Sequence, residues 1–132
     1  NTSYDRAVER DLQKMYETLL SEVPGVAFCG GFDANCYMPV HNRRFSEPPN
    51  GDPQHDLAFS RHKRIYDDTA CRRALASREP MLLQTYVRDT GEVLCDLSFP
   101  IMVGNRRWGV FRVGFAPSLL GRTANSTTQM RA

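Results

Sequence analysis

The last third of the chain carries three strand patterns separated by two tight turns, and this feature limits the possible folds most. Side chains of residues 93–99 alternate between two faces, one of which carries Leu94, Asp96 and Ser98. The turns DTG and GNR are short enough to join neighbouring antiparallel strands. We therefore predict a three-stranded meander from the segments MLLQTYVR (81–88), EVLCDLSFPIMV (92–103) and RWGVFRVGF (107–115).

The first 80 residues add two strands and two helical segments to this meander. The predicted elements are a helix (4–22), two strands around a turn (26–40), a long loop rich in proline (43–59) and a mostly helical segment (60–77). Five antiparallel strands with helices on one face indicate an α+β fold. We expect a five-stranded antiparallel sheet with a long N-terminal helix and a long insertion of loop and helix.

The N-terminal helix carries one narrow apolar seam. Its members follow a 4-3-4 spacing and are Val8, Leu12, Met15 and Leu19. A seam of this kind is typical of helix pairs and coiled coils, and it predicts a homodimer formed through this helix. Packing of the same helix on its own sheet is the alternative.

The composition excludes some classes of protein. A chain of 132 residues fits one domain, and 17 basic against 15 acidic residues give a net charge of only +2. Binders of nucleic acid usually carry a strong basic excess, so we expect none here. No apolar run approaches the ~20 residues of a membrane span. The sequence opens directly into a helix pattern, as a fragment of a longer protein would.

Four cysteines bear on the compartment. Cys29 and Cys95 lie in strand patterns and are expected to be buried, while Cys36 in a turn is expected to react fastest with thiol reagents. Together with Cys71, they match no zinc-ligand spacing. We predict reduced thiols, which favours the cytoplasm over the periplasm.

Several motifs in this order resemble the sensor domain of bacterial methyl-accepting chemotaxis proteins. They are FCGGFDANCYMPVHNRRFSEP, KRIYDDTA, LLQTYVRDTGEV, DLSFPIMV and RRWGVFRVGF, and they cover residues 22–116. The resemblance implies a Cache/PAS-like module with a pocket between sheet and loops, attached to signalling helices of the same longer chain. It divides the chain into a signalling or dimerisation helix (1–22), the sensor domain (23–116) and a tail (117–132).

The chain departs from the resembling domains at three positions. Cys36 and Cys71 replace frequent glycines, and at Cys36 this predicts an unusual backbone geometry in the turn. Arg107 replaces a frequent histidine, which argues against metal or haem ligation there.

Arg112 is the most informative polar residue, because it lies inside an apolar strand and, by alternation, on the face of Trp108. A solvent-facing Arg stacked on Trp is one interpretation, and a pocket wall that binds a carboxylate or another polar anion is the other. Asp96 on the neighbouring strand is a candidate counter-ion or contact for a ligand amine. Tyr86 offers a hydroxyl group and a flat ring.

The stretch SRHKRIYDD (60–68) mixes charges of both signs, which fits an ion-paired helix rather than a phosphate-binding track. In the resembling domains it borders the pocket. We expect Arg64 or Asp68 to face the pocket, and Arg61 and Lys63 to be solvated.

No motif for catalysis or metal binding is present, since the chain lacks a nucleophile elbow, a Walker loop and a zincin helix. His41 is assigned to the pocket rather than to a metal. The predicted ligand-binding residues are Arg112, Trp108, Tyr86, Asp96, Arg64 and His41.

These observations predict a non-enzymatic sensor domain, without a cofactor, that binds a small polar ligand and biases attached signalling helices. It would belong to the cytoplasmic portion of a bacterial receptor, either membrane-bound or not, with the periplasm as the alternative. A dimerisation module that binds no ligand and a redox or haem sensor are the alternatives.

Overall fold

The computed structural model describes residues 4–88 and 90–120. The elements in these ranges are, in chain order, α1 (Asp5–Glu22), β1 (Val26–Asp33), β2 (Tyr37–Met38), the 3-10 turn η1 (Arg43–Phe45), α2 (Pro53–Phe59), β3 (Arg64–Ile65), α3 (Thr69–Ala76), β4 (Leu82–Val87), β5 (Val93–Val103) and β6 (Arg106–Phe115). The predicted α+β class and the long N-terminal helix are confirmed.

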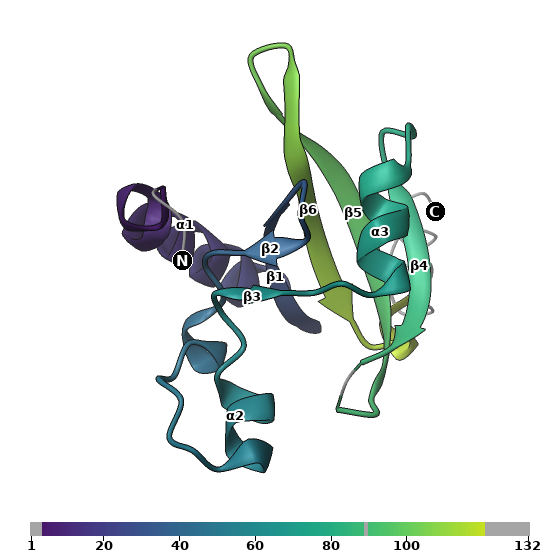
Figure 1. Ribbon diagram of the computed structural model, residues 1–132. Helices are drawn as coiled ribbons and strands as arrows, with labels where there is room; N and C mark the ends of the chain where they lie inside the picture. Colours follow the sequence, from purple (N-terminus) through teal and green to yellow (C-terminus); the bar gives the residue numbers. More distant parts are fainter. Residues whose placement is uncertain (1–3, 89, 121–132) are drawn as a thin grey trace.

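Four strands form one antiparallel sheet in the order β1-β6-β5-β4 (Figure 1). The predicted meander is therefore confirmed, and β1 pairs with the last strand. The predicted fifth strand is wrong, because β2 pairs with β3 in a separate two-stranded ladder. Pro39 follows β2 directly and has no N–H group to extend a ladder, which explains why β2 is so short.

The turn between β1 and β2 has the unusual backbone that its sequence predicted. Cys36 has a φ of 60°, in the left-handed region that glycine adopts readily. Asp33 stabilises this turn, because its Oδ1 accepts hydrogen bonds from the backbone N–H groups of Asn35 (2.8 Å) and Tyr37 (3.1 Å).

The predicted placement of the helices on one face of the sheet is wrong, because the two faces pack against different helices. On one face α1 supplies Tyr16, which packs with Cys29 and Val40 and with partly buried neighbours: Val8, Leu12, Leu19, Phe111 and Val113. On the other face Phe32 and Val110 pack with Cys71 and Ala74 of α3. In Figure 1, α3 lies in front of the part of the sheet formed by β5 and β4, while α1 lies at the left of the view, next to β1. Strand alternation thus gives β6 an α1 face and an α3 face.

A β-bulge changes the face of Trp108. The pairing of β5 with β6 slips by one residue between Ile101 and Met102, and Trp108 is the residue left over. Its ring lies on the α1 face, 5.9 Å from the ring of Tyr4 in an edge-to-face contact. The predicted common face of Trp108 and Arg112 is therefore wrong, because the extra residue shifts the alternation by one.

The segment before α3 also differs from its prediction. The expected loop at 43–59 contains η1 and α2, and α2 begins in the usual way, with Asp52 accepting from the Gln54 N–H group (3.1 Å) and proline in its first turn. The expected helix at 60–77 is wrong for its first half, since it contains β3 and only α3 is helical. Arg61 is 4% exposed, so its predicted solvated position is wrong.

The predicted seam of α1 is used mainly within the chain. Val8, Leu12 and Leu19 pack against the sheet, while Met15 is 64% exposed. The alternative of a helix packed on its own sheet is thus confirmed for three of the four residues. The homodimer stays a prediction.

All four cysteines are free thiols, and all four are buried. The burial predicted for Cys29 and Cys95 is confirmed. Cys36, predicted to react fastest, is buried as well, because the turn folds its side chain into the core beside Met38 and Cys71; its reactivity stays a prediction.

Candidate ligand-binding site

A cavity of about 250 Å³ lies between the α3 face of the sheet and the segment that leads from β2 to α3. It is lined by Phe28, Phe32, His41, Arg61, Tyr66, Asp68, Tyr86, Val87, Arg88 and Arg112. Its volume lies just below the ~300 Å³ lower end of pockets for drug-sized ligands, so it suits a smaller molecule. Aromatic rings and guanidinium groups make up most of this lining.

Glycine at position 114 makes room for one wall of the cavity. A Cβ atom there would lie 2.1 Å from the ring of Phe28. The ring of Phe28 therefore covers the backbone of β6 directly. This close approach brings an aromatic wall next to Arg112, two residues earlier on the same strand.

Arg112 and Asp96 form a buried ion pair beneath the cavity. The Nε atom of Arg112 donates to Oδ2 of Asp96 over 2.9 Å, and the two side chains are 2% and 0% exposed. Burial raises the pKa of Asp96, and the neighbouring guanidinium limits that rise. Arg112 keeps its positive charge, since the pKa of an arginine lies far above neutrality.

This ion pair is incompletely satisfied. Among the described residues, Nη2 of Arg112 and Oδ1 of Asp96 have no hydrogen-bond partner, although both atoms are buried. Buried polar groups normally find a partner, because leaving one unpaired is costly. Arg112 lines the cavity, so a ligand in it could supply the missing acceptor.

Aromatic rings surround the guanidinium groups of the cavity. The Cζ atom of Arg112 lies 5.0 Å from the ring centre of Phe32 and 5.4 Å from that of Tyr86. Arg88, whose Nη1 is paired with Glu92 over 3.1 Å, lies 5.4 Å from the ring of Phe28. These contacts place both guanidinium groups over aromatic rings, where they are partly desolvated.

His41 contributes a neutral imidazole. It is 2% exposed, and its Nδ1 accepts a hydrogen bond from the Asn42 N–H group over 2.7 Å, so Nε2 carries the ring proton. Burial lowers the pKa of His41 well below its usual value, and the positive charges of Arg61 and Arg88 lower it further. A neutral His41 adds no charge to the cavity.

Two hydroxyl groups face the same region. The hydroxyl of Tyr66 donates to the carbonyl oxygen of Arg61, which fixes this wall. Burial raises the pKa of Tyr86 to about 12, so its hydroxyl stays protonated and can donate. Asp68 supplies the carboxylate of the lining, and its Oδ1 accepts from the Cys71 N–H group over 2.8 Å at the start of α3.

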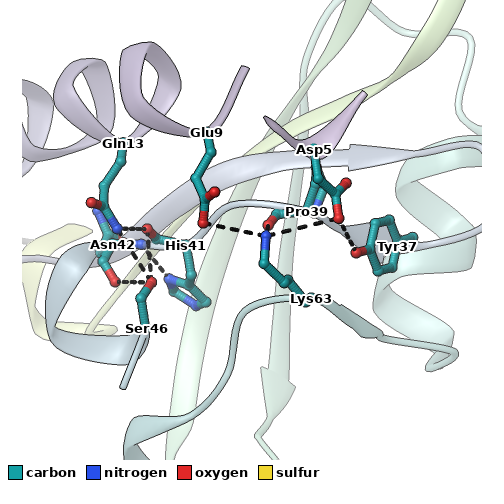
Figure 2. Close-up of polar contacts among 9 residues, drawn as sticks. All are labelled: Asp5, Glu9, Gln13, Tyr37, Pro39, His41, Asn42, Ser46 and Lys63. Carbon is teal, nitrogen blue, oxygen red and sulfur yellow. Dashed lines mark hydrogen bonds and ion pairs between the residues drawn. The ribbon is translucent and has the colours of Figure 1, made fainter. Parts of the chain in front are cut away.

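One wall of the cavity is tied to the beginning of α1 through Lys63 (Figure 2). The Nζ atom of Lys63 lies 3.3 Å from Glu9 Oε1 and 3.8 Å from Asp5 Oδ2, and it donates to the Pro39 carbonyl oxygen over 3.3 Å. Tyr37 donates to the same Asp5 carboxylate over 2.9 Å. Since Lys63 lies between lining residues of the chain, α1 and the cavity wall share this cluster.

A second set of hydrogen bonds joins the middle of α1 to the backbone of His41. Gln13 donates to the His41 carbonyl oxygen over 3.2 Å, and Ser46 donates to the same oxygen, as Figure 2 shows. One turn later, Glu17 accepts from the side chain of Asn42 over 3.2 Å. Movement of the His41 segment would therefore strain two contacts with α1.

The structure gathers some of the predicted site residues and separates others. Arg112, Tyr86 and His41 line the cavity, and Asp96 lies beneath it as the predicted counter-ion of Arg112. Their role in ligand binding stays a prediction.

Two predicted site residues lie elsewhere. Trp108 is on the opposite face of the sheet, as described above. Arg64 lines a separate groove with His62 and Lys63, and its Cζ atom lies 5.3 Å from the ring of Tyr66. Of the pair Arg64 and Asp68, Asp68 faces the cavity.

Sequence reasoning missed several lining residues, chiefly Arg61, Arg88, Phe28 and Phe32. Arg88 follows β4 two residues after Tyr86, and this spacing on a predicted strand was an available indication. No indication was available for Arg61, because the helix expected around it does not form.

Within residues 4–88 and 90–120, no group of three or more His, Cys, Asp or Glu side chains is arranged to hold a metal ion. No helix in these ranges is both long and apolar enough to cross a membrane. No protein-family model matches the chain, and neither the curated proteins nor the solved structures contain a significant match. Any function must therefore be inferred from the cavity and the sequence themselves.

Proposed function

We propose that the chain is a ligand-binding sensor domain of a bacterial chemoreceptor, without enzymatic activity, and that the cavity beside Arg112 receives a small polar ligand. The observation that carries this proposal is the buried guanidinium with an Nη2 atom that has no partner among the described residues. A domain that only dimerises has no need of such a group in a cavity. A filled, apolar interior would be more stable there.

The contacts of α1 supply a means of output. Lys63 and Gln13 join α1 to the two segments that carry Arg61 and His41 of the cavity. A ligand that prefers one arrangement of these segments would bias α1 by its difference in affinity for the two arrangements. Attached signalling helices of a longer chain would receive that bias.

We infer a Cache/PAS-like module from the sequence motifs and from the arrangement of the elements. A long N-terminal helix, an antiparallel sheet and a cavity on one sheet face covered by short elements support this assignment. The four free thiols support a reducing compartment, and hence the cytoplasmic portion of a receptor rather than a periplasmic one.

A ligand-free dimerisation module is a second candidate, and one observation favours it. The β4 edge of the sheet exposes apolar side chains on β4 and β5: Leu83 (51%), Val93 (49%) and Val87 (65%), the last of which also borders the cavity. Contiguous apolar surface of this kind often marks a contact with another protein. Sedimentation equilibrium at several concentrations would reveal a dimer, with Leu83→Lys as the disrupting variant and Met102→Lys, on the β5–β6 hairpin, as the control.

Thermal unfolding of the wild-type protein with amino acids, organic acids, amines and purines tests the ligand-binding proposal. A ligand that binds only the folded state raises Tm by mass action. Hydrogen exchange with the best compound should then slow at amides of α1 as well as at the cavity. A panel without any shift in Tm would contradict the proposal.

A further inference from the structure

The lining of the cavity carries an excess of positive charge. Three guanidinium groups, from Arg61, Arg88 and Arg112, face one carboxylate, from Asp68. Asp68 already accepts a backbone hydrogen bond at the start of α3. This arrangement favours an anion over a cation.

The contacts already made by the three guanidinium groups single out Arg112 as the candidate anchor for that anion. Arg88 is paired with Glu92, and Nη1 of Arg61 donates to the carbonyl oxygen of Leu57 over 2.7 Å. Arg112 keeps an Nη2 atom without a partner among the described residues, and the ring of Tyr86, whose hydroxyl stays protonated, is centred 5.4 Å from the Cζ atom of Arg112. A planar guanidinium with such an Nη2 atom and a neighbouring hydroxyl group match the two oxygens of one carboxylate.

The other lining residues favour a ligand whose part outside the carboxylate is apolar. Phe28, Phe32 and Tyr66 present aromatic rings, and Val87 adds an aliphatic surface. A flat or short apolar group can fill the space between such rings, whereas a sugar would leave its hydroxyl groups unpaired.

From these observations we propose that the cavity binds small monocarboxylates with an apolar body, such as benzoate or phenylacetate, with the carboxylate on Arg112 and Tyr86. This inference rests on the proposed sensor function and names the class of its ligand.

Matched pairs of compounds test the ligand class without any change to the protein. Calorimetric titration of the wild-type protein should give a Kd for benzoate or phenylacetate at least about tenfold lower than for benzamide or phenylacetamide, since only the acid forms charged hydrogen bonds. Benzylamine and phenylalanine serve as the cationic and zwitterionic members of the set.

Variants then locate the carboxylate. Arg112→Lys keeps the charge but loses the planar fork, and Tyr86→Phe removes only the hydroxyl; each should raise the Kd of the acid severalfold or more. Arg106→Lys, the same change at an exposed position of β6, should leave it unchanged. Circular dichroism confirms that each variant is folded.

The outcomes separate the two proposals. Equal or tighter binding of the amide, the amine or the amino acid would overturn the monocarboxylate class and leave the ligand-binding function standing. Acid binding that is unchanged in both Arg112→Lys and Tyr86→Phe would overturn the site. No binding by any member, combined with no Tm shift in the broad panel, would overturn both the ligand class and the sensor function.

Discussion

The two faces of β6 differ in what they bury. Toward α1, Phe111 and Val113 pack with Tyr16 in an apolar core. Toward α3, Val110 is followed by Arg112, whose charge is held by Asp96 beside a cavity. The same ten-residue strand thus contributes to a filled interior on one side and to an incompletely satisfied polar site on the other. We infer that the α1 face mainly stabilises the domain and that the α3 face carries its function.

The largest expected effect comes from breaking the ion pair on the α3 face. Arg112→Met leaves the Asp96 carboxylate buried without its partner, and the free energy of unfolding should fall by about 3–5 kcal/mol. Chemical denaturation measures this loss.

The double variant Arg112→Met with Asp96→Leu sharpens this test. Replacing both charges by apolar groups should recover most of the lost stability, because the ion pair itself adds little to folding. A double variant as unstable as the single one would show that the pair is structural, and would weaken the division between the faces.

A smaller effect is expected on the α1 face. Leu12→Ala and Leu19→Ala each remove a partly buried side chain from the sheet contact, and each should lower the free energy of unfolding by about 1–2 kcal/mol. The more drastic changes of both residues to Glu should destabilise the domain, rather than only separate a dimer. Variants with unchanged stability would show that these side chains do not pack on the sheet in solution.

The faces should also differ in their response to pH. The pKa of His41 is lower in the folded than in the unfolded protein, because of burial first and then of Arg61, Arg88 and His62. The folded state therefore binds fewer protons, and stability is fully present above about pH 6.5 and falls as the pH drops below it, by up to about 1.4 kcal/mol per pH unit.

Replacing this residue isolates its contribution. The difference in unfolding free energy between wild type and His41→Gln should shrink or change sign as the pH falls from 7 to 5. On the α1 face, burial raises the pKa values of Tyr16 and Cys29, so both stay uncharged throughout this range and add no slope. A difference that is independent of pH would mean that His41 is not buried as a neutral group.

The smallest effect on stability is expected at Met15, the exposed member of the predicted seam. Met15→Glu should change the unfolding free energy by no more than about 0.5 kcal/mol. If α1 nevertheless forms a dimer, this variant should shift the sedimentation equilibrium toward monomer. A wild-type protein that stays monomeric at all concentrations would contradict the homodimer.

The sequence was sufficient for features that depend on local periodicity. The long helix, the meander and the position of Asp96 beside Arg112 all follow from spacings of two or of three to four residues, whereas the burial of Arg112 was left open. Cys36 was also recognised as a position with unusual backbone geometry, although its burial was not.

Features that depend on register or on distant packing were not predictable in this way. One bulge residue moved Trp108 to the other face, and only the neighbouring glycine hinted at it. Arg61 became buried because β3 pairs with β2, which the charge pattern around Arg61 concealed. The start of α2, in contrast, was predictable from local sequence. Asp52 and Pro53 are a recognisable helix start that the proline-rich segment concealed.

The central claim is that the α3 face, and not the α1 face, receives the ligand. The most direct measurement compares the ligand-induced rise in Tm for two variants: Arg112→Met with Asp96→Leu on the α3 face, and Phe111→Leu on the α1 face, each with phenylacetate. We predict that the Phe111→Leu protein keeps the rise seen in wild type and that the double variant, although folded, loses it. A double variant that retains the full rise, or a Phe111→Leu protein that loses it, would contradict this account.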